Sequence, residues 1–448
     1  MTQESTIPRI KEEIKHSITL RLFSIAVLIL LMLIPMAMIM SIINEREYRK
    51  EEAIREVSDK WGTAQTVTGP VLVLPYLTYI NRDGVREPQG HAYAYFLPDR
   101  LDVSAKVDPE IRKRGMYQVA LYRSGLNLTG SFSRPDVTQL GLDPNDVIWN
   151  EATIAVGIKD MSGLQQATQI EWNRKPITLE PGLTNSYKIP DGLANKVPID
   201  SLSQRFDFNM ELALRGSQNL RLVPVGKETQ VNLDCNWPDP KFNGAILPDS
   251  SDITDTHTAA TWKVLHVNRN YPQAWKDSSQ QFEESAFGVD LYIPLDEYQK
   301  SMRSAKYAIL ILSLTFVLFF GYEVFNKKRI HPIQYLLVGL ALSIFYVLLV
   351  SLSEHLSFNP AYVISSIAVI SLITVYAHGA LQNKKAANGM GGSLALLYGF
   401  IFLLLQSEDY ALLIGSIGLF IVLAGMMYFS RKVDWYELAK GKKSKIQE

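Results

Sequence analysis

The sequence predicts a membrane protein of the α+β class, with about six transmembrane helices and a large extracytoplasmic, antiparallel β-rich domain that resembles a sandwich. The first observation is an uncharged apolar run over residues 22–43. The second is a series of five apolar stretches within residues 307–429. The third is that residues 62–306 alternate apolar and polar positions in short runs separated by turn residues, which is typical of β-strands.

The composition excludes several classes of function. The 448 residues carry 45 Lys and Arg against 45 Asp and Glu, so the chain has no net charge and no basic field for nucleic acid. Cys235 is the one cysteine, so neither an intrachain disulfide nor a Cys-rich metal site can form. Because Cys235 ends an apparent strand, we interpret it as a small buried hydrophobic residue rather than a nucleophile.

The first membrane span is predicted over residues 22–43, after a cytoplasmic N-terminal arm of residues 1–21. Its uncharged length suffices to cross about 30 Å of hydrocarbon. A cleaved signal peptide is the alternative, but the run is longer than a usual signal-peptide core and ends without a small-x-small cleavage site. Pro35 is tolerated inside a membrane helix when neighbouring helices replace the lost hydrogen bond.

Five further spans are predicted within residues 307–429. Four of their apolar stretches are long enough to cross a bilayer with little help from flanking residues. The stretch 394–405 is shorter and needs residues 389–393 to reach both surfaces, so a re-entrant segment remains an alternative there. The five stretches cover residues 307–322, 335–352, 361–377, 394–405 and 411–429.

The orientation follows from the distribution of Lys and Arg in short connections. These residues occur in the N-terminal arm, after the second and fourth spans, and in the basic tail of residues 430–448. The connections near Glu354 and Glu408 contain neither Lys nor Arg. We therefore predict that both termini lie in the cytoplasm and that residues 44–306 lie outside, in the periplasm of a cell with two membranes.

The outer domain is predicted to begin with a helical stalk. Residues 45–61 are charged on most faces and lack helix breakers, so the first membrane helix should continue until Gly62. The segment from Val67 to Pro75 then predicts a buried strand, and alternating runs continue almost to the second span. Because few helical stretches separate these runs, an antiparallel sandwich or a pair of sheets is favoured over a parallel α/β sheet.

Residue spacings that are typical of catalysis or phosphate binding are absent from the sequence. The strongest metal candidate combines Asp252, Asp255, His257 and His266, whose side chains are of the types that bind divalent ions. Their spacing is loose, and we interpret the segment as a polar loop whose short side chains cap turns. We predict no catalytic residue, cofactor or metal site.

Polar residues of the membrane segments lie near helix ends. Glu323, Glu354, His355 and His378 are each placed where interfacial water is available, so we interpret them as helix-end anchors rather than a proton relay. Glu354 and His355 together are the candidate structural or coupling pair, which would link the outer domain to the helices by hydrogen bonds or an ion pair. The alternative is that both are solvated.

The last span carries three glycines on one stripe. Gly415, Gly418 and Gly425 follow helical spacing, and small residues on one helix face permit close packing against a neighbour. We predict that this stripe packs helices together and binds no ligand.

Several segments resemble the CreD family of inner-membrane proteins, and the resemblance extends over nearly the whole chain. They include Gly69 to Pro75, Tyr95 to Asp99, the run from His331 to His355, and Asp434 to Tyr436. The resemblance implies a Gram-negative inner-membrane protein of a two-component regulon, linked to envelope stress, colicin tolerance and the β-lactam response. It implies no catalytic motif, since the family has no established reaction.

Our leading hypothesis is a non-enzymatic protein of cell-envelope integrity. Its helices would be anchored among membrane lipids, while its outer domain contacts a periplasmic protein or a wall component. A small transporter or flippase-like protein is one alternative, which requires Glu323, Glu354 or His355 to face a water-filled cavity. An envelope-acting hydrolase is another, which requires acids or histidines to converge in a pocket of the outer domain.

Overall fold

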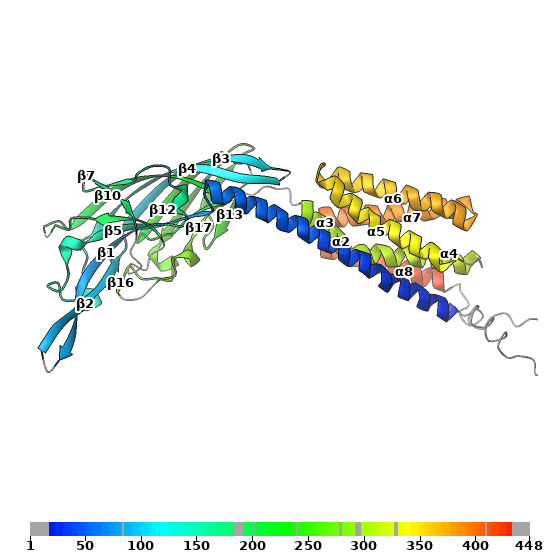
Figure 1. The fold of residues 1–448 in the computed structure, drawn as a ribbon, viewed down its shortest axis with the longest axis horizontal. Coiled ribbons are helices and arrows are strands. Elements are labelled where there is room, and N and C mark those ends of the chain that lie inside the picture. The colour runs from blue at the N-terminus through cyan, green and yellow to red at the C-terminus, as the bar shows by residue number, and fades with distance from the viewer. Residues whose placement is uncertain are drawn as a thin grey trace, which may run out of the picture. The chain divides into compact units, whose positions relative to one another are not determined.

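The computed structural model describes residues 18–431 except 83–84, 116, 183–190, 201, 239, 277–279, 292–296, 327–329 and 408–409. Most of the N-terminal arm, the basic loop 327–329 and the tail from residue 432 onward, including Asp434 to Tyr436, lie outside the described residues. The chain forms two compact units (Figure 1). The helical unit comprises residues 1–49 and 295–448, and the β unit comprises residues 50–294.

Helix α2 (Ile18–Trp61) contributes residues to both units. It continues through the predicted first span and the charged segment after it, because neither contains a helix breaker other than Pro35. Gly62 ends the helix with a φ of 142°, a conformation that favours glycine. A Cβ atom at Gly62 would also stand 2.7 Å from the carbonyl oxygen of Arg215. The helix end is therefore fixed by both backbone conformation and packing.

Six further helices of the helical unit lie in the described part of the chain. In chain order they are α3 (Glu297–Lys306), α4 (Ala308–Asn326), α5 (Pro332–Ser353), α6 (Phe358–Leu381), α7 (Lys384–Gln406) and α8 (Ala411–Ser430).

Four helices in the described part of the chain are long and apolar enough to cross a membrane, namely α2, α5, α6 and α7. The helices α3 and α4 bend by 41° at Tyr307 and add a fifth span if the pair counts as one. The apolar part of α8, Leu412–Tyr428, is shorter. Six spans therefore stay a prediction. Helix α7, for which the sequence left a re-entrant segment open, is continuous over 23 residues.

The β unit contains two large sheets. The first has nine described strands in the order β13-β17-β11-β1-β5-β9-β8, with β2 beside β1 and β16 beside β2. Its strands are β1 (Gln65–Arg82), β2 (Val85–Phe96), β5 (Thr153–Ile158), β8 (Glu180–Pro181), β9 (Gly192–Lys196), β11 (Asn219–Leu222), β13 (Lys241–Gly244), β16 (Ala274–Lys276) and β17 (Phe287–Asp290).

The second sheet has eight described strands in the order β14-β15-β12-β3-β4-β10-β6-β7. They are β3 (Arg100–Arg114), β4 (Tyr117–Ser133), β6 (Gln169–Trp172), β7 (Lys175–Thr178), β10 (Arg205–Ser217), β12 (Glu228–Cys235), β14 (Ser250–Ile253) and β15 (Thr258–Leu265).

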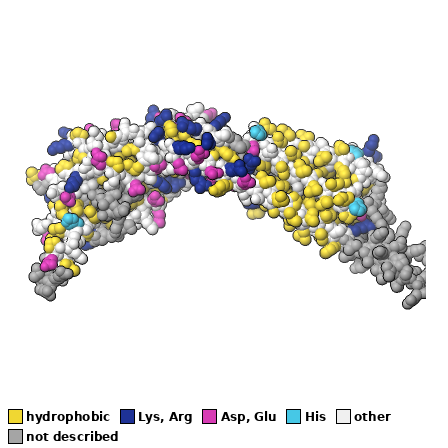
Figure 2. All heavy atoms as spheres, in the orientation of Figure 1, with side chains coloured by type: hydrophobic (Ala, Val, Ile, Leu, Met, Phe, Trp, Pro, Cys, Tyr) yellow, Lys and Arg dark blue, Asp and Glu magenta, His cyan; other side chains and the backbone are white. Residues whose placement is uncertain are grey.

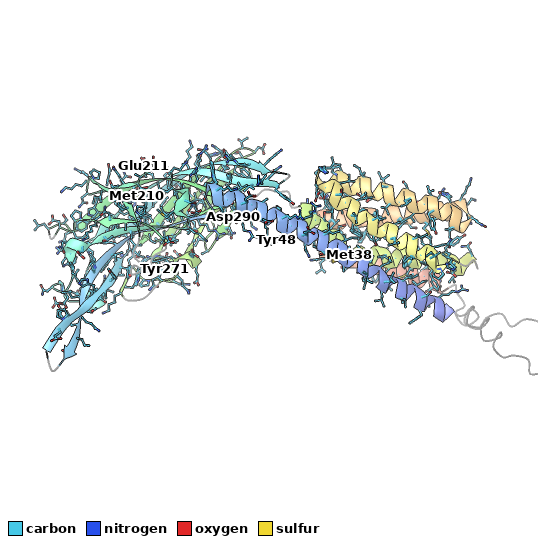
Figure 3. The ribbon with its side chains drawn as sticks, in the orientation of Figure 1. Met38, Tyr48, Met210, Glu211, Tyr271 and Asp290 are labelled. Atoms are coloured by element: carbon cyan, nitrogen blue, oxygen red, sulfur yellow. The ribbon has the colours of Figure 1, made fainter. Side chains whose placement is uncertain are left out.

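One apolar core is shared by both sheets, as the alternation of the strands predicted. Along β10, Met210 is 1% exposed whereas its neighbour Glu211 is exposed (Figure 3). The core joins residues such as Val71 and Ile154 of the first sheet to Phe206 and Trp262 of the second. Since successive side chains of a strand point to opposite faces, each strand can contribute alternate residues to this core.

Two strand pairs depart from the predicted antiparallel arrangement. Strand β1 pairs with β11 in parallel, and β3 pairs with β12 in parallel. Both pairs join strands that are far apart in sequence, so long connections allow them to enter the sheet from the same end. A two-residue alternation reports that a residue faces the core, but it does not report which strand lies beside it or in which direction.

Candidate functional site

Glu354 and His355, the predicted pair at the end of α5, have different surroundings. The side chain of Glu354 is 13% exposed, and its Oε1 lies 3.4 Å from Nε of Arg46 on α2. His355 is exposed and makes no ion pair with a described residue. Consecutive residues at a helix end point in different directions, so only the first of them reaches α2. Arg46–Glu354 is therefore the ion pair at this helix end, and it lies within the helical unit.

The prediction that Glu323 is a solvated helix-end anchor is wrong. Glu323 is only 4% exposed, and its Oε1 accepts a hydrogen bond of 2.8 Å from Nη1 of Arg21. Its Oε2 accepts a hydrogen bond of 3.3 Å from the hydroxyl of Tyr335. A buried carboxylate is stable only with a cation and hydrogen-bond donors, and here it has both. The sequence showed Arg21 only as one of several basic residues before the first span.

Both glutamates lie at the C-terminal ends of their helices. Glu323 is in the last turn of α4, and Glu354 directly follows α5. The helix macrodipole is negative at this end and disfavours a carboxylate there. Arg21 and Arg46 supply the positive charge that each helix end needs. Helix α2 therefore stabilises two helix ends that would otherwise carry uncompensated negative charge.

Between the two arginines, α2 has one buried face. Its buried residues recur at intervals of three, four or seven, the spacing of a helix that packs along a seam. Met32 lies within this seam, and its Sδ is 2.8 Å from the position that a Cβ on Gly339 of α5 would occupy. A larger residue at position 339 would therefore force the Met32 side chain to move. The buried residues of the seam are Ile25, Met32, Met36, Ile39 and Ile43.

In the β unit, the end of α2 is surrounded by arginines. The indole ring of Trp61 lies 4.7 Å from the guanidinium of Arg112, 5.1 Å from that of Arg123 and 5.0 Å from that of Arg215. The indole Nε1 also donates a hydrogen bond of 3.3 Å to the carbonyl of Tyr122. We call Arg112, Arg123 and Arg215 the arginine collar. Figure 2 shows Lys and Arg side chains gathered on this part of the β unit.

Two acidic residues hold the same helix end. Glu56 accepts hydrogen bonds from Lys60 at 2.9 Å and from Arg114 at 2.8 Å, and these bonds lower the pKa of Glu56. Asp160 accepts hydrogen bonds from the backbone N–H and the hydroxyl of Thr63, at 2.7 and 2.8 Å. Burial would raise the pKa of Asp160, but the hydrogen bonds from Ser162 and Thr63 outweigh it and lower the pKa.

The four residues of the metal candidate are not brought together. Asp252, Asp255 and His266 are exposed, and His257 lies 3.6 Å from Asp234 instead. In the described part of the chain, no group of three or more His, Cys, Asp or Glu residues could hold a metal ion.

The interpretation of the segment from Asp249 to His257 as a loop is wrong, because Ser250–Ile253 form β14 beside β15. All four residues are exposed, so this edge strand lacks the alternation that marks a strand in sequence. The interpretation of Cys235 is confirmed, since its side chain is 0% exposed at the end of β12.

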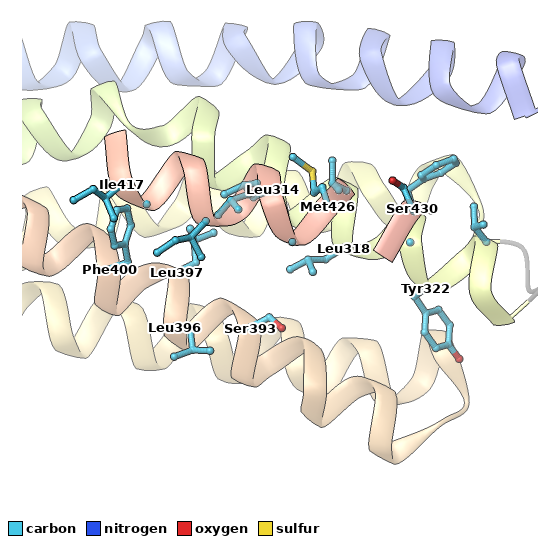
Figure 4. A pocket seen from close by; sticks show the side chains of 18 of the residues that line it. Leu314, Leu318, Tyr322, Ser393, Leu396, Leu397, Phe400, Ile417, Met426 and Ser430 are labelled. Carbon is cyan, nitrogen blue, oxygen red and sulfur yellow. The ribbon is translucent and has the colours of Figure 1, made fainter. Parts of the chain in front are cut away.

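An apolar cavity of about 950 Å³ lies between α4, α7 and α8 (Figure 4). Its lining contains no Asp, Glu, Lys, Arg or His. The glycines of α8 differ in how closely they pack against other helices. Gly418 packs closely, because an added Cβ would stand 2.1 Å from Cζ of Phe400, whereas no atom lies within 4 Å of a Cβ on Gly425. The packing prediction is therefore confirmed for Gly418 and wrong for Gly425, which lines the cavity.

Comparisons with known proteins identify one family. A family model described as "Inner membrane protein CreD" matches residues 17–436. The inner membrane protein CreD of Escherichia coli strain K12 is 35% identical to this chain over 431 residues, which cover 93% of this chain and 94% of that protein. The two chains therefore correspond over nearly their entire lengths.

Proposed function

This chain belongs to the CreD family of inner membrane proteins, and from this premise we propose that it supports the integrity of the cell envelope without catalysing a reaction. In this proposal both termini lie in the cytoplasm, the helices are anchored in the inner membrane, and the β unit lies in the periplasm. The β unit contacts a periplasmic protein or a wall component. The physiological consequences are tolerance to colicins and a response to β-lactams.

The observation that carries the proposal is the way in which α2 is held. In the helical unit it is held by Arg21–Glu323 and Arg46–Glu354, and in the β unit its end is enclosed by the arginine collar. No break in the helix separates these contacts. A simple tether between two independent domains needs no such contacts. A continuous helix that is fixed at several points is suited to transmitting a force or a displacement.

The use of the acidic residues supports a non-enzymatic role. Catalytic acids are usually kept near a cavity where a substrate can reach them. Here Glu323 and Glu354 are engaged by arginines, and neither lines the cavity between α4, α7 and α8. Glu56 and Asp160 are engaged at the end of α2. These residues are accounted for by their structural contacts.

The test is to interrupt α2 between its contacts in the two units. Four glycines inserted after Tyr48 would break the helix, whereas four alanines inserted at the same place would preserve it. Both variants are expressed in cells that lack the gene, and β-lactam and colicin tolerance are measured alongside the amount of protein in the membrane. We expect the glycine variant to lose tolerance and the alanine variant to retain most of it.

One result would overturn the envelope role, and another would overturn only the role of α2 as a rigid connection. If the intact chain does not restore tolerance to cells that lack the gene, the envelope role is wrong. If the glycine variant restores tolerance as fully as the intact chain at equal membrane levels, the envelope role stands but α2 does not act as a rigid connection.

A further inference from the structure

We propose that the cavity between α4, α7 and α8 binds the acyl chains of one anionic phospholipid from the cytoplasmic leaflet of the bilayer. This inference concerns only the helical unit and goes beyond the envelope role, which does not depend on it. It rests on the apolar lining of the cavity, on its size and on the basic residues at one of its ends.

The lining excludes water as a stable occupant. Residues such as Leu314, Leu397, Phe400 and Ile417 form most of the wall, and Gly425 widens it. Water needs two to four polar partners to occupy an internal site, and such a wall does not provide them. The space of about 950 Å³ is partly open, since Leu396 and Ile421 of its lining are 78% and 62% exposed, and leaving it empty would deny these side chains dispersion contacts. Hydrocarbon chains are the occupant that a bilayer supplies to a space of this chemistry.

The size of the cavity fits a ligand of this kind. Cavities that bind small molecules have volumes of about 300–1,000 Å³, so this one lies at the upper end of the range. Gly425 adds to the space, because no atom lies within 4 Å of the position of its Cβ. A flexible acyl chain can follow an irregular wall of leucine, phenylalanine and glycine.

Polar groups mark one end of the cavity. Figure 4 shows Tyr322 and Ser430 at one end and Phe400 and Ile417 at the other. The hydroxyl of Tyr322 donates a hydrogen bond of 3.2 Å to the carbonyl of Leu381, three residues before the start of α7. The turn between α6 and α7 therefore adjoins this end, which becomes the cytoplasmic end in the predicted orientation.

Basic residues gather at the same end. Helix α7 begins with Lys384 and Lys385, and Arg431 directly follows Ser430 of the lining. The guanidinium of Arg431 lies 4.6 Å from the ring centre of Tyr428. Lys384, Lys385 and Arg431 form no ion pair with a described residue. Basic residues beside a cleft between membrane helices favour anionic lipid headgroups, and the N-terminus of α7 adds a positive dipole end.

The experiment is native mass spectrometry of the full chain purified in a mild detergent. The protein is titrated with phosphatidylglycerol or with the zwitterionic phosphatidylethanolamine. We expect one phosphatidylglycerol to remain bound per chain, with a preference over phosphatidylethanolamine of at least about fivefold. Replacing Lys384, Lys385 and Arg431 by glutamine should abolish the preference.

Filling the cavity should remove the lipid. Gly425→Leu projects a side chain into the cavity, and Gly399→Leu is its control, because Gly399 is exposed, has no atom within 4 Å of its Cβ position and does not line the cavity. Ser393→Phe fills the space from α7 and serves if Gly425→Leu is unstable. We expect both filling variants to retain less than a tenth of the lipid that the Gly399→Leu protein retains.

Three results would overturn the inference. One is lipid binding that Gly425→Leu and Ser393→Phe leave unchanged. Another is equal retention of the anionic and zwitterionic lipids by the intact chain. The third is a dimer that carries no lipid, because a second copy of the chain would then cover the cavity.

Discussion

Arg21 and Arg46 lie on the same face of α2, and each is paired with a glutamate at the C-terminal end of a neighbouring helix. Their separation of 25 residues corresponds to about seven helical turns, or about 37 Å along the axis. This length exceeds the bilayer hydrocarbon of about 30 Å by a few ångströms at each end. The two ion pairs therefore bracket a membrane span whose intervening residues up to Asn44 are uncharged.

Removal of Arg21 should destabilise the helical unit. Arg21→Gln leaves the buried carboxylate of Glu323 without a cation, and we expect the free energy of unfolding to fall by about 3 kcal/mol. The measurement is a thermal or denaturant melt of the detergent-solubilised chain. Adding Glu323→Gln should restore much of the loss, since no unpaired charge then remains. Arg205→Gln is the matched control, because its ion pair with Asp207 is exposed. A similar loss of stability in this control would contradict the prediction that Arg21 stabilises the buried Glu323.

The pair Arg46–Glu354 should respond to charge reversal. Arg46→Glu and Glu354→Arg each place like charges together, whereas the double variant restores an attraction. We expect each single variant to lower the melting temperature and the double variant to recover it. The exposed pair Glu45–Arg49 on the same helix is the control, and its reversal should change little. Failure of the double variant to recover would show that Arg46 does not stabilise Glu354.

His355 should be replaceable. It is exposed and unpaired among the described residues, so His355→Asn is expected to change the free energy of unfolding by less than about 0.5 kcal/mol. Envelope tolerance should be unchanged in the same variant. A loss of tolerance with an unchanged melting temperature would make His355 a functional residue in its own right.

Contact between α2 and α5 should be sensitive to volume at Gly339. Gly339→Val forces a side chain against Met32 and should cost about 1–3 kcal/mol through overpacking. Met32→Ala in the same chain should recover part of the cost. Gly379→Val is the control, because Gly379 is exposed and its Cβ position has no atom within 4 Å. Equal melting temperatures for the two valine variants would contradict this packing.

The thiol of Cys235 should be unreactive in the folded chain. Burial raises the pKa of Cys235 to about 12, and the carboxylates of Asp234 and Asp108 add to the rise. A thiolate is therefore scarce at pH 8, and a thiol reagent should label the protein only after unfolding. The folded state favours the neutral thiol, so its contribution to stability is present below the unfolded pKa near 8.5 and is lost as pH rises through the folded pKa. Rapid labelling of the native chain would contradict its burial.

Asp160 should contribute to the acid sensitivity of the β unit. Its pKa is lowered in the folded chain, so its contribution to stability is present above the unfolded pKa near 3.9 and is lost as pH falls through the folded pKa. Asp160→Asn should lower the melting temperature at pH 7 and reduce its dependence on pH between about 5 and 3. An unchanged pH dependence would show that the contact with Thr63 does not favour the carboxylate.

The sequence by itself determined the features that depend on neighbours along the chain. An uncharged run such as residues 22–43 must avoid water wherever the helix is placed, and the absence of breakers over residues 45–61 lets α2 continue to Gly62. Alternation in segments such as Arg205–Ser217 specified strands with one buried face. Motifs along the chain were sufficient to recognise the CreD family, which the comparisons confirm.

Only the tertiary structure decided which distant residues meet. Arg21 and Glu323 are 302 residues apart, and nothing near either residue distinguishes this pair from a solvated anchor and a basic arm. The parallel neighbours β1 and β11, the edge strand β14 and the open space at Gly425 likewise depend on the surrounding elements. Periodicity records whether a side chain is buried, whereas its partner is selected by packing and by the need to neutralise buried charge.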